Sequence, residues 1–140
     1  ILSLSRQNSK FLNYDVSFND FKKGAFEIES GEDLTIFATG TEVELALEVK
    51  EILSEFSVQI ISAPILNRVN KELINSLNIS ERLFTLELGR SIGWSNFLGS
   101  ITKSFSIETF GKSAPQSKLM ESFKFTPKLI AEEIRDILLN

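Results

Sequence analysis

The 140-residue sequence contains neither cysteine nor histidine. Without cysteine there is no disulfide framework and no thiolate site. Without histidine the chain lacks the commonest general base, the serine–histidine triads and the usual ligands of zinc. Catalysis by this chain alone would therefore depend on carboxylates, lysine, arginine or a borrowed cofactor.

The sequence also lacks an excess of basic charge and any long apolar run. Its net charge of −4 argues against a general nucleic-acid or membrane-surface binder, because both need a basic face. No apolar run approaches the roughly 20 residues of a membrane helix, and the first residues do not resemble a signal peptide. We therefore expect a cytoplasmic protein that has neither nucleic acid nor a membrane as partner. Because the chain begins on Ile1 and not on methionine, we also expect it to be a piece of a longer protein.

What remains is the composition of an ordinary globular protein. The apolar fraction of 42% and the charged fraction of 24% are typical of a folded domain, so we do not expect disorder. The length suits one domain with a core of two or three layers. Twelve phenylalanines against one tryptophan and one tyrosine make phenylalanine the main aromatic residue of that core.

A strand, a tight turn and a helix are predicted in the first third of the chain. The run from Leu34 to Gly40 is β-prone throughout and ends in glycine, as is typical of a strand buried on both faces. Thr41 and Glu44 have the spacing of a capping box, which predicts Thr41 as the N-cap of a helix. The apolar stripe of this helix is predicted to consist of Leu45, Val49, Ile52, Leu53 and Phe56.

The same alternation continues along the chain. We predict a short edge strand at 24–28 and further strands at 57–62, 82–88 and 101–109, with helices or helical turns at 66–76, 91–99 and 117–123. The last helix has Thr126 as N-cap and Pro127 at its first position. Strands alternating with helices predict an α/β domain with a mostly parallel sheet covered on both faces. The apolar face of the last helix is predicted to be Ile130, Ile134, Ile137 and Leu138.

The turn after Gly40 is one candidate site. It follows a strand and precedes a helix, which is where a doubly wound fold binds anions. However, Glu42 and Glu44 suit the helix dipole themselves and would repel a phosphate. The sequence contains no G-x-G-x-x-G and no Walker lysine. We therefore interpret the turn as a capped helix start.

Three further candidates also have structural explanations. Glu87 could be a buried acid with a raised pKa, but without a second carboxylate or a histidine in view we interpret it as a partnered or rim-exposed residue. Trp94 and Phe97 are interpreted as packing residues. The loop at 110–115 contains Lys112 and Ser113, which could hold an anion, although we interpret it as a solvated loop.

Arg6 ends an apolar, strand-like run in the stretch Leu4-Ser-Arg-Gln7. A guanidinium at such a place is either a solvated charge or a fork of donors for phosphate or carboxylate. The residues alone favour the solvated charge.

An ordered set of motifs resembles the C-terminal domain of transketolases. The Ser-Arg-Gln start followed by Ala-Thr-Gly-Thr-Glu-Val separates that family from deoxyxylulose-phosphate synthases and the β-chains of 2-oxo acid dehydrogenases, which share the domain fold. The sequence departs from the family at Glu87-Leu-Gly, where Glu-Ala-Gly is frequent, and this affects local packing. The motifs are Leu4–Gln7, Phe37–Ala46, Ile60–Pro64, Leu86–Gly89 with Gly93-Trp94, Phe110–Pro115 and Glu121–Thr126.

The resemblance implies a three-layer α/β/α domain with a mostly parallel sheet of about five strands and one antiparallel edge strand. It places this domain at 24–140, with 1–23 as a linker and the end of a preceding domain. The parent would be a homodimeric transferase of the pentose phosphate pathway. It would use thiamine diphosphate and a divalent metal, Mg or Ca, to move a two-carbon ketol unit between ketose and aldose phosphates.

The resemblance also implies which groups this segment lacks. The cofactor, the metal and the catalytic residues belong to the preceding domains, so we expect no catalytic, cofactor-binding or metal-binding residue here and no activity of the isolated segment. Arg6 would contact the phosphate of the sugar substrate. Two other hypotheses stay open: an independent small-molecule-binding or regulatory α/β module, which would bind a ligand without its parent, and a pure dimerisation module, which would self-associate.

Overall fold

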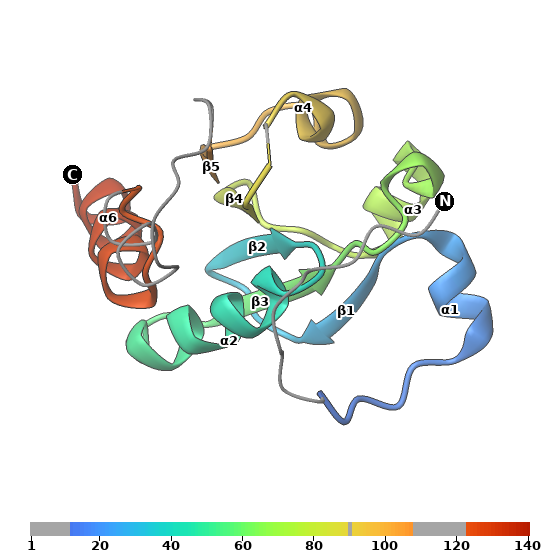
Figure 1. Ribbon diagram of the computed structural model, residues 1–140, viewed down its shortest axis with the longest axis horizontal. Helices are drawn as coiled ribbons and strands as arrows, with labels where there is room; N and C mark the ends of the chain where they lie inside the picture. Colours follow the sequence, from blue (N-terminus) through green and yellow to red (C-terminus); the bar gives the residue numbers. More distant parts are fainter. Residues whose placement is uncertain (1–11, 90, 108–122) are drawn as a thin grey trace.

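A five-stranded sheet forms the middle layer of the structure (Figure 1). The computed structural model describes residues 12–89, 91–107 and 123–140. The sheet order is β1-β3-β2-β4-β5; β1 is antiparallel to β3, and the other neighbours are parallel. The predicted α/β class, with a mostly parallel sheet and one antiparallel edge strand, is confirmed. The strands are β1 (Phe26–Glu29), β2 (Leu34–Ala38), β3 (Val58–Ser62), β4 (Leu83–Glu87) and β5 (Lys103–Ser106).

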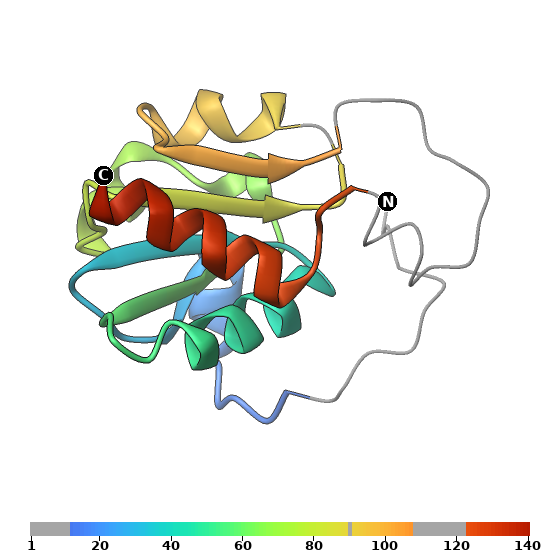
Figure 2. The ribbon, with the colours of Figure 1, turned by 90° about the vertical axis from the view of Figure 1, so that its left-hand side faces the viewer.

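Helices cover both faces of the sheet (Figure 2). On one face lie α2 (Glu42–Ile52) and α6 (Pro127–Leu139), and on the other lie α3 (Lys71–Ser76) and α4 (Ile92–Leu98). The short 3-10 helix η1 (Leu66–Arg68) precedes α3, and α1 (Phe18–Lys23) precedes β1. Within the described ranges, none of these helices has both the length and the apolar character that a bilayer crossing requires.

The central strands supply both cores. Ile36 of β2 packs in the cluster with α2 and α6, whereas the next residue, Phe37, packs in the cluster with α3 and α4. Ile60 and Ile61 of β3 divide in the same way. Successive side chains of a strand point to opposite faces, so a strand covered on both faces is mainly apolar. Two buried polar residues of these strands are paired with each other, since the Thr35 hydroxyl of β2 donates to Gln59 Oε1 of β3 at 2.6 Å.

The start of α2 differs from the prediction. Thr41 has a helical backbone, with φ −68° and ψ −21°, and its side chain makes no capping hydrogen bond. Its hydroxyl instead donates to Glu42 Oε1 at 2.8 Å. The N–H groups of Glu42 and Val43 donate to the carbonyls of Thr39 and Gly40, at 3.0 and 3.4 Å. Thr41 occupies the N-cap position of α2, as predicted, but the predicted capping hydrogen bond of its side chain is not formed. Gly40, with φ +54°, turns the chain immediately before it.

The buried face of α2 is also shifted from the predicted stripe. Leu45 is only partly buried and Ile52 is 38% exposed. The helix packs against α6 as well as against the sheet, so two neighbours and not one determine which side chains lose contact with water. The buried apolar residues of α2 and its C-cap are Val43, Ala46, Val49 and Leu53.

The last helix begins as predicted. The Thr126 side chain accepts a hydrogen bond from the N–H of Leu129 at 3.4 Å, and Pro127 occupies the first helical position. Ile130 and Ile134 are fully buried, as expected for its apolar face, whereas Ile137 is 37% exposed. The local cap signals in the sequence were therefore sufficient to locate this helix.

Helix α1 was not predicted, because residues 1–23 were interpreted as a linker and the end of a preceding domain. The Ser17 hydroxyl caps this helix by accepting from the N–H of Asp20 at 3.1 Å. Gly24 ends it in the left-handed conformation, with φ +102°. A serine before the helix and a glycine after it are typical helix start and stop signals, so Ser17 and Gly24 could have indicated this helix from the sequence.

Candidate functional site

The parallel strands end together at one edge of the sheet, which is where α/β folds of this kind bind ligands. Ala38 of β2 pairs with Leu86 of β4, so Glu87, which ends β4, lies beside the turn that follows β2. Glu42 is the first residue of the helix after that turn. Glu42, Glu87 and the neighbouring Trp94 form what we call the carboxyl-edge site.

Glu42 is a buried acid, with only 8% of its surface exposed. Burial raises its pKa above the ordinary value of 4.5, and the negative charge of Glu87 raises it further. The hydrogen bond from the Thr41 hydroxyl and one from the backbone N–H act in the opposite direction. The sequence analysis placed Glu42 in the first turn of a helix but did not predict that it would be buried.

Glu87 is half-buried at the end of β4. Burial raises the pKa of this carboxyl group, and the indole of Trp94 partly offsets the rise. The side chain lies close to Gly89, since a Cβ atom on that glycine would come within 2.9 Å of Glu87 Oε1. The second carboxylate that the sequence analysis did not find near Glu87 is Glu42, which only the pairing of β2 with β4 brings close.

Trp94 packs beneath this edge and is 1% exposed. Its ring meets Phe37 edge to face, with centroids 5.9 Å apart and an interplanar angle of 67°, and Phe97 packs against the same cluster. The predicted packing role of Trp94 and Phe97 is confirmed. In the described part of the chain the indole N–H has no partner within hydrogen-bonding geometry.

The carboxyl-edge site does not fit a metal or a diphosphate cofactor. No three acidic side chains among residues 12–89, 91–107 and 123–140 are placed to hold a metal ion, and two carboxyl groups beside an indole supply too few oxygen ligands for a divalent cation. We therefore derive no catalytic step from these residues. Arg6, Lys112 and Ser113, the other sequence candidates, lie outside the described residues.

The two raised pKa values predict how stability depends on pH. Between pH 4.5 and the raised folded-state values, the folded chain binds more protons than the unfolded chain, so its stability falls as pH rises through this window. Glu42→Gln removes one titrating group. The free energy of unfolding of this variant minus that of the wild type is expected to increase as pH rises from about 4.5 to about 7.5, as measured by urea unfolding.

Glu51→Gln provides the matched control, since Glu51 lies on the exposed side of the same helix and the substitution removes the same charge. If the difference between Glu42→Gln and the wild type did not change with pH, Glu42 would not be the buried acid described here.

Comparisons with known proteins agree with one another. A family model described as the transketolase-like C-terminal domain matches residues 24–126. A transketolase from Halalkalibacterium halodurans is 32% identical over 152 residues, which cover 99% of this chain and 23% of that protein. A transketolase from Aquifex aeolicus is 33% identical over 147 residues, covering 94% of this chain and 21% of that protein.

The fold matches solved structures of the same kind. The structure of a mutant transketolase from Pichia stipitis superposes with a TM-score of 0.82 at 25% identity, covering 96% of this chain and 20% of that one. The chain thus spans between a fifth and a quarter of the length of these relatives.

Proposed function

This chain belongs to the transketolase C-terminal domain family, and on that premise we propose that it is the C-terminal domain of a thiamine-diphosphate-dependent transketolase. The parent would transfer a two-carbon ketol unit from a ketose phosphate to an aldose phosphate. The observation that carries the proposal is the match of the family model over residues 24–126. The similarity to curated transketolases along nearly the whole chain supports it.

In this proposal the domain contributes architecture and not catalytic groups. Its sheet and two apolar cores form a stable body, and the whole sequence lacks the histidines that commonly move protons in active sites. We assign thiamine diphosphate and its divalent metal to the preceding domains of the same chain. We also assign the domain a share of the surface of a homodimer.

One substrate contact is assigned to this segment. We propose that Arg6, in the Ser-Arg-Gln motif that resembles the family's, binds the phosphate of the sugar substrate. A guanidinium presents a planar fork of donors that matches a phosphate, and it stays charged at any working pH. The contact would help to position the sugar, while the bonds that change are handled elsewhere in the parent.

Because the catalytic groups are assigned to the preceding domains, the segment and the full-length protein are expected to differ in ketol transfer and in binding of thiamine diphosphate. The purified 140-residue chain is expected to show no ketol transfer from xylulose 5-phosphate to ribose 5-phosphate and no binding of thiamine diphosphate in calorimetric titration. The full-length protein, supplied with thiamine diphosphate and Mg²⁺, is expected to show both. Turnover by the segment above a contaminant control would contradict the structural role, and an inactive full-length protein would contradict the transketolase assignment.

A further inference from the structure

Helix α1 presents its apolar side away from the domain. No residue of the helix is buried, and its two phenylalanines, Phe18 and Phe21, are 73% and 42% exposed. A surface helix usually turns its apolar stripe toward the core and its polar side toward water. The orientation of α1 is the reverse of this arrangement.

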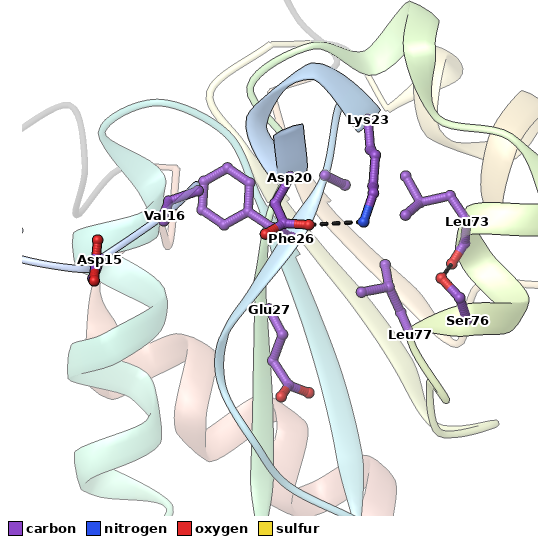
Figure 3. A pocket seen from close by; sticks show the side chains of 10 residues that line it. Asp15, Val16, Asp20, Lys23, Phe26, Glu27, Leu73, Ser76 and Leu77 are labelled. Carbon is purple, nitrogen blue, oxygen red and sulfur yellow. Dashed lines mark hydrogen bonds and ion pairs between the residues drawn. The ribbon is translucent and has the colours of Figure 1, made fainter. Parts of the chain in front are cut away.

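The side of α1 that faces the domain is polar. Asp20 and Lys23 form an ion pair at 2.7 Å, and both line a groove of about 330 Å³ between α1, β1 and α3 (Figure 3). Leu73 of α3 and Leu77, the C-cap residue of that helix, line the same groove. Residues three apart on a helix share a side, so Asp20 and Lys23 occupy one side of α1 while the phenylalanines occupy another.

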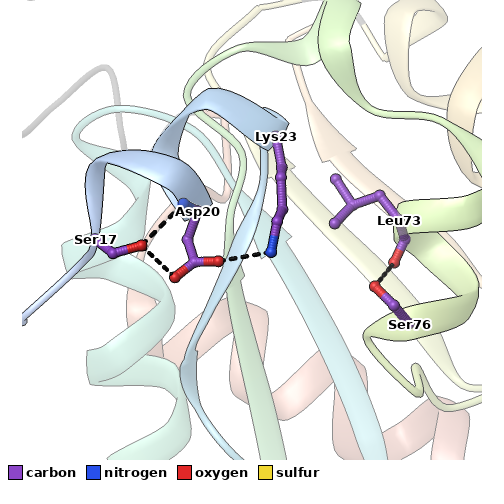
Figure 4. A network of polar contacts seen from close by, with 5 residues as sticks. All are labelled: Ser17, Asp20, Lys23, Leu73 and Ser76. Atoms are coloured by element: carbon purple, nitrogen blue, oxygen red, sulfur yellow. Dashed lines mark hydrogen bonds and ion pairs between the residues drawn. The ribbon is translucent and has the colours of Figure 1, made fainter.

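Short-range contacts organise α1 but do not cover its phenylalanines. The Ser17 hydroxyl also donates to the Asp20 carboxylate at 2.6 Å, which continues the polar chain of contacts to Lys23 (Figure 4). The Lys22 ammonium lies 4.8 Å from the centre of the Phe18 ring. Isolated helices shorter than about 12 residues are marginal in water. A six-residue helix therefore depends on tertiary contacts, and a partner that covers Phe18 and Phe21 would add to them.

We propose that the outer face of α1, formed by Phe18 and Phe21, docks on the part of the same polypeptide that precedes Ile1. The proposal rests on the proposed function, in which a longer transketolase continues upstream. The matched family is a C-terminal domain, its model begins at residue 24 just after α1, and the chain covers only 23% and 21% of two relatives. The missing length therefore lies on the N-terminal side of α1.

The length of the connection favours this occupant over a second copy of the chain. From Ile1 to Phe18 the backbone reaches at most about 60 Å, even when it is fully extended. A tether this short holds the upstream part near α1 at an effective concentration in the millimolar range. A second copy that is not already bound as the dimer partner would have to reach the same face by free diffusion from a far lower concentration.

Photo-cross-linking in the full-length protein tests the proposal. Phe18 is replaced by p-benzoylphenylalanine, which keeps the aromatic ring, and isotopically light and heavy proteins are mixed under conditions that exchange the subunits of a dimer before irradiation. We expect a cross-link from position 18 to a peptide upstream of Ile1 within one molecule, identified by mass spectrometry. The same substitution at Leu139, which is 70% exposed on α6, is the control and is expected not to capture that peptide.

The other outcomes overturn the proposal. A product that joins light and heavy chains would assign the face to a second copy, and the absence of any cross-link at position 18 would leave the face without the proposed occupant. Hydrogen exchange of the unmodified full-length protein gives a second measure, in which amides at 18–23 are expected to exchange at least tenfold more slowly than in an unstructured chain. Exchange at the unstructured rate would also overturn the docking.

Ketol transfer by the unmodified full-length protein, compared with the cross-linking result, separates the two proposals. If the unmodified protein were inactive but the p-benzoylphenylalanine protein still formed the cross-link from position 18 to the upstream peptide, the proposed function would be contradicted and the docking supported. An active protein without the cross-link would do the opposite.

Discussion

Leu53→Ala is expected to lower the free energy of unfolding by about 2–5 kcal/mol. Leu53 has no exposed surface and lies at the end of α2, in the core shared by α2, α6 and the sheet. The substitution removes buried methyl groups and leaves a cavity that the close-packed surroundings fill only in part, so the transfer and cavity costs add. Urea unfolding of the chain followed by circular dichroism measures the loss.

Leu45→Ala on the same helix is the matched control. It deletes the same atoms, but Leu45 is only partly buried, so a smaller loss is expected, below about 2 kcal/mol. Equal losses at the two positions would contradict the observed orientation of α2. They would instead favour the apolar stripe predicted from helical spacing, in which both leucines face the core.

Arg6→Ala in the full-length enzyme is expected to reduce kcat/KM for a phosphorylated donor by about tenfold to a few hundredfold. A hydrogen bond between charged groups contributes about 1.5–3 kcal/mol, and about 1.4 kcal/mol corresponds to one decade of rate. Because the phosphate is bound in the ground state and in the transition state alike, most of the loss should appear in KM. Steady-state kinetics with xylulose 5-phosphate measure both constants.

Two further measurements distinguish phosphate binding from a structural role of Arg6. Arg6→Lys should recover only part of the loss, because an ammonium is a point charge and not a bidentate fork. Hydroxypyruvate, a donor without phosphate, should be used almost as well by Arg6→Ala as by the wild type. Equal damage with both donors would mean that Arg6 supports the junction between domains, and the phosphate assignment would fall.

The sequence by itself determined the features that depend on a few neighbouring residues. Strands β2 and β3 consist mainly of apolar residues because both of their faces are covered. The start of α6 follows from Thr126 and Pro127, a cap and a first-turn residue that act within one turn. The ordered motifs indicated the family, which the comparisons confirmed.

Similar local signals failed where a backbone turn or a second neighbour intervened. Thr41 occupies the N-cap position, but it has a helical backbone after the left-handed turn at Gly40 and its side chain makes no capping hydrogen bond. Leu45 fits a helical stripe, yet α2 packs against α6 as well as the sheet, and the buried face is shifted. A capping pattern and a periodicity describe a helix in isolation and do not contain the positions of its neighbours.

Only the tertiary structure decided the relations between residues that are distant in sequence. The charge of Glu87 raises the pKa of Glu42 because β2 pairs with β4, and no spacing in the sequence indicates that pairing. The outward face of α1 likewise becomes visible only when the groove beside α3 shows which side of the helix the domain already uses. Caps and apolar runs act over a few residues, whereas burial, pKa shifts and free surfaces depend on which elements pack together.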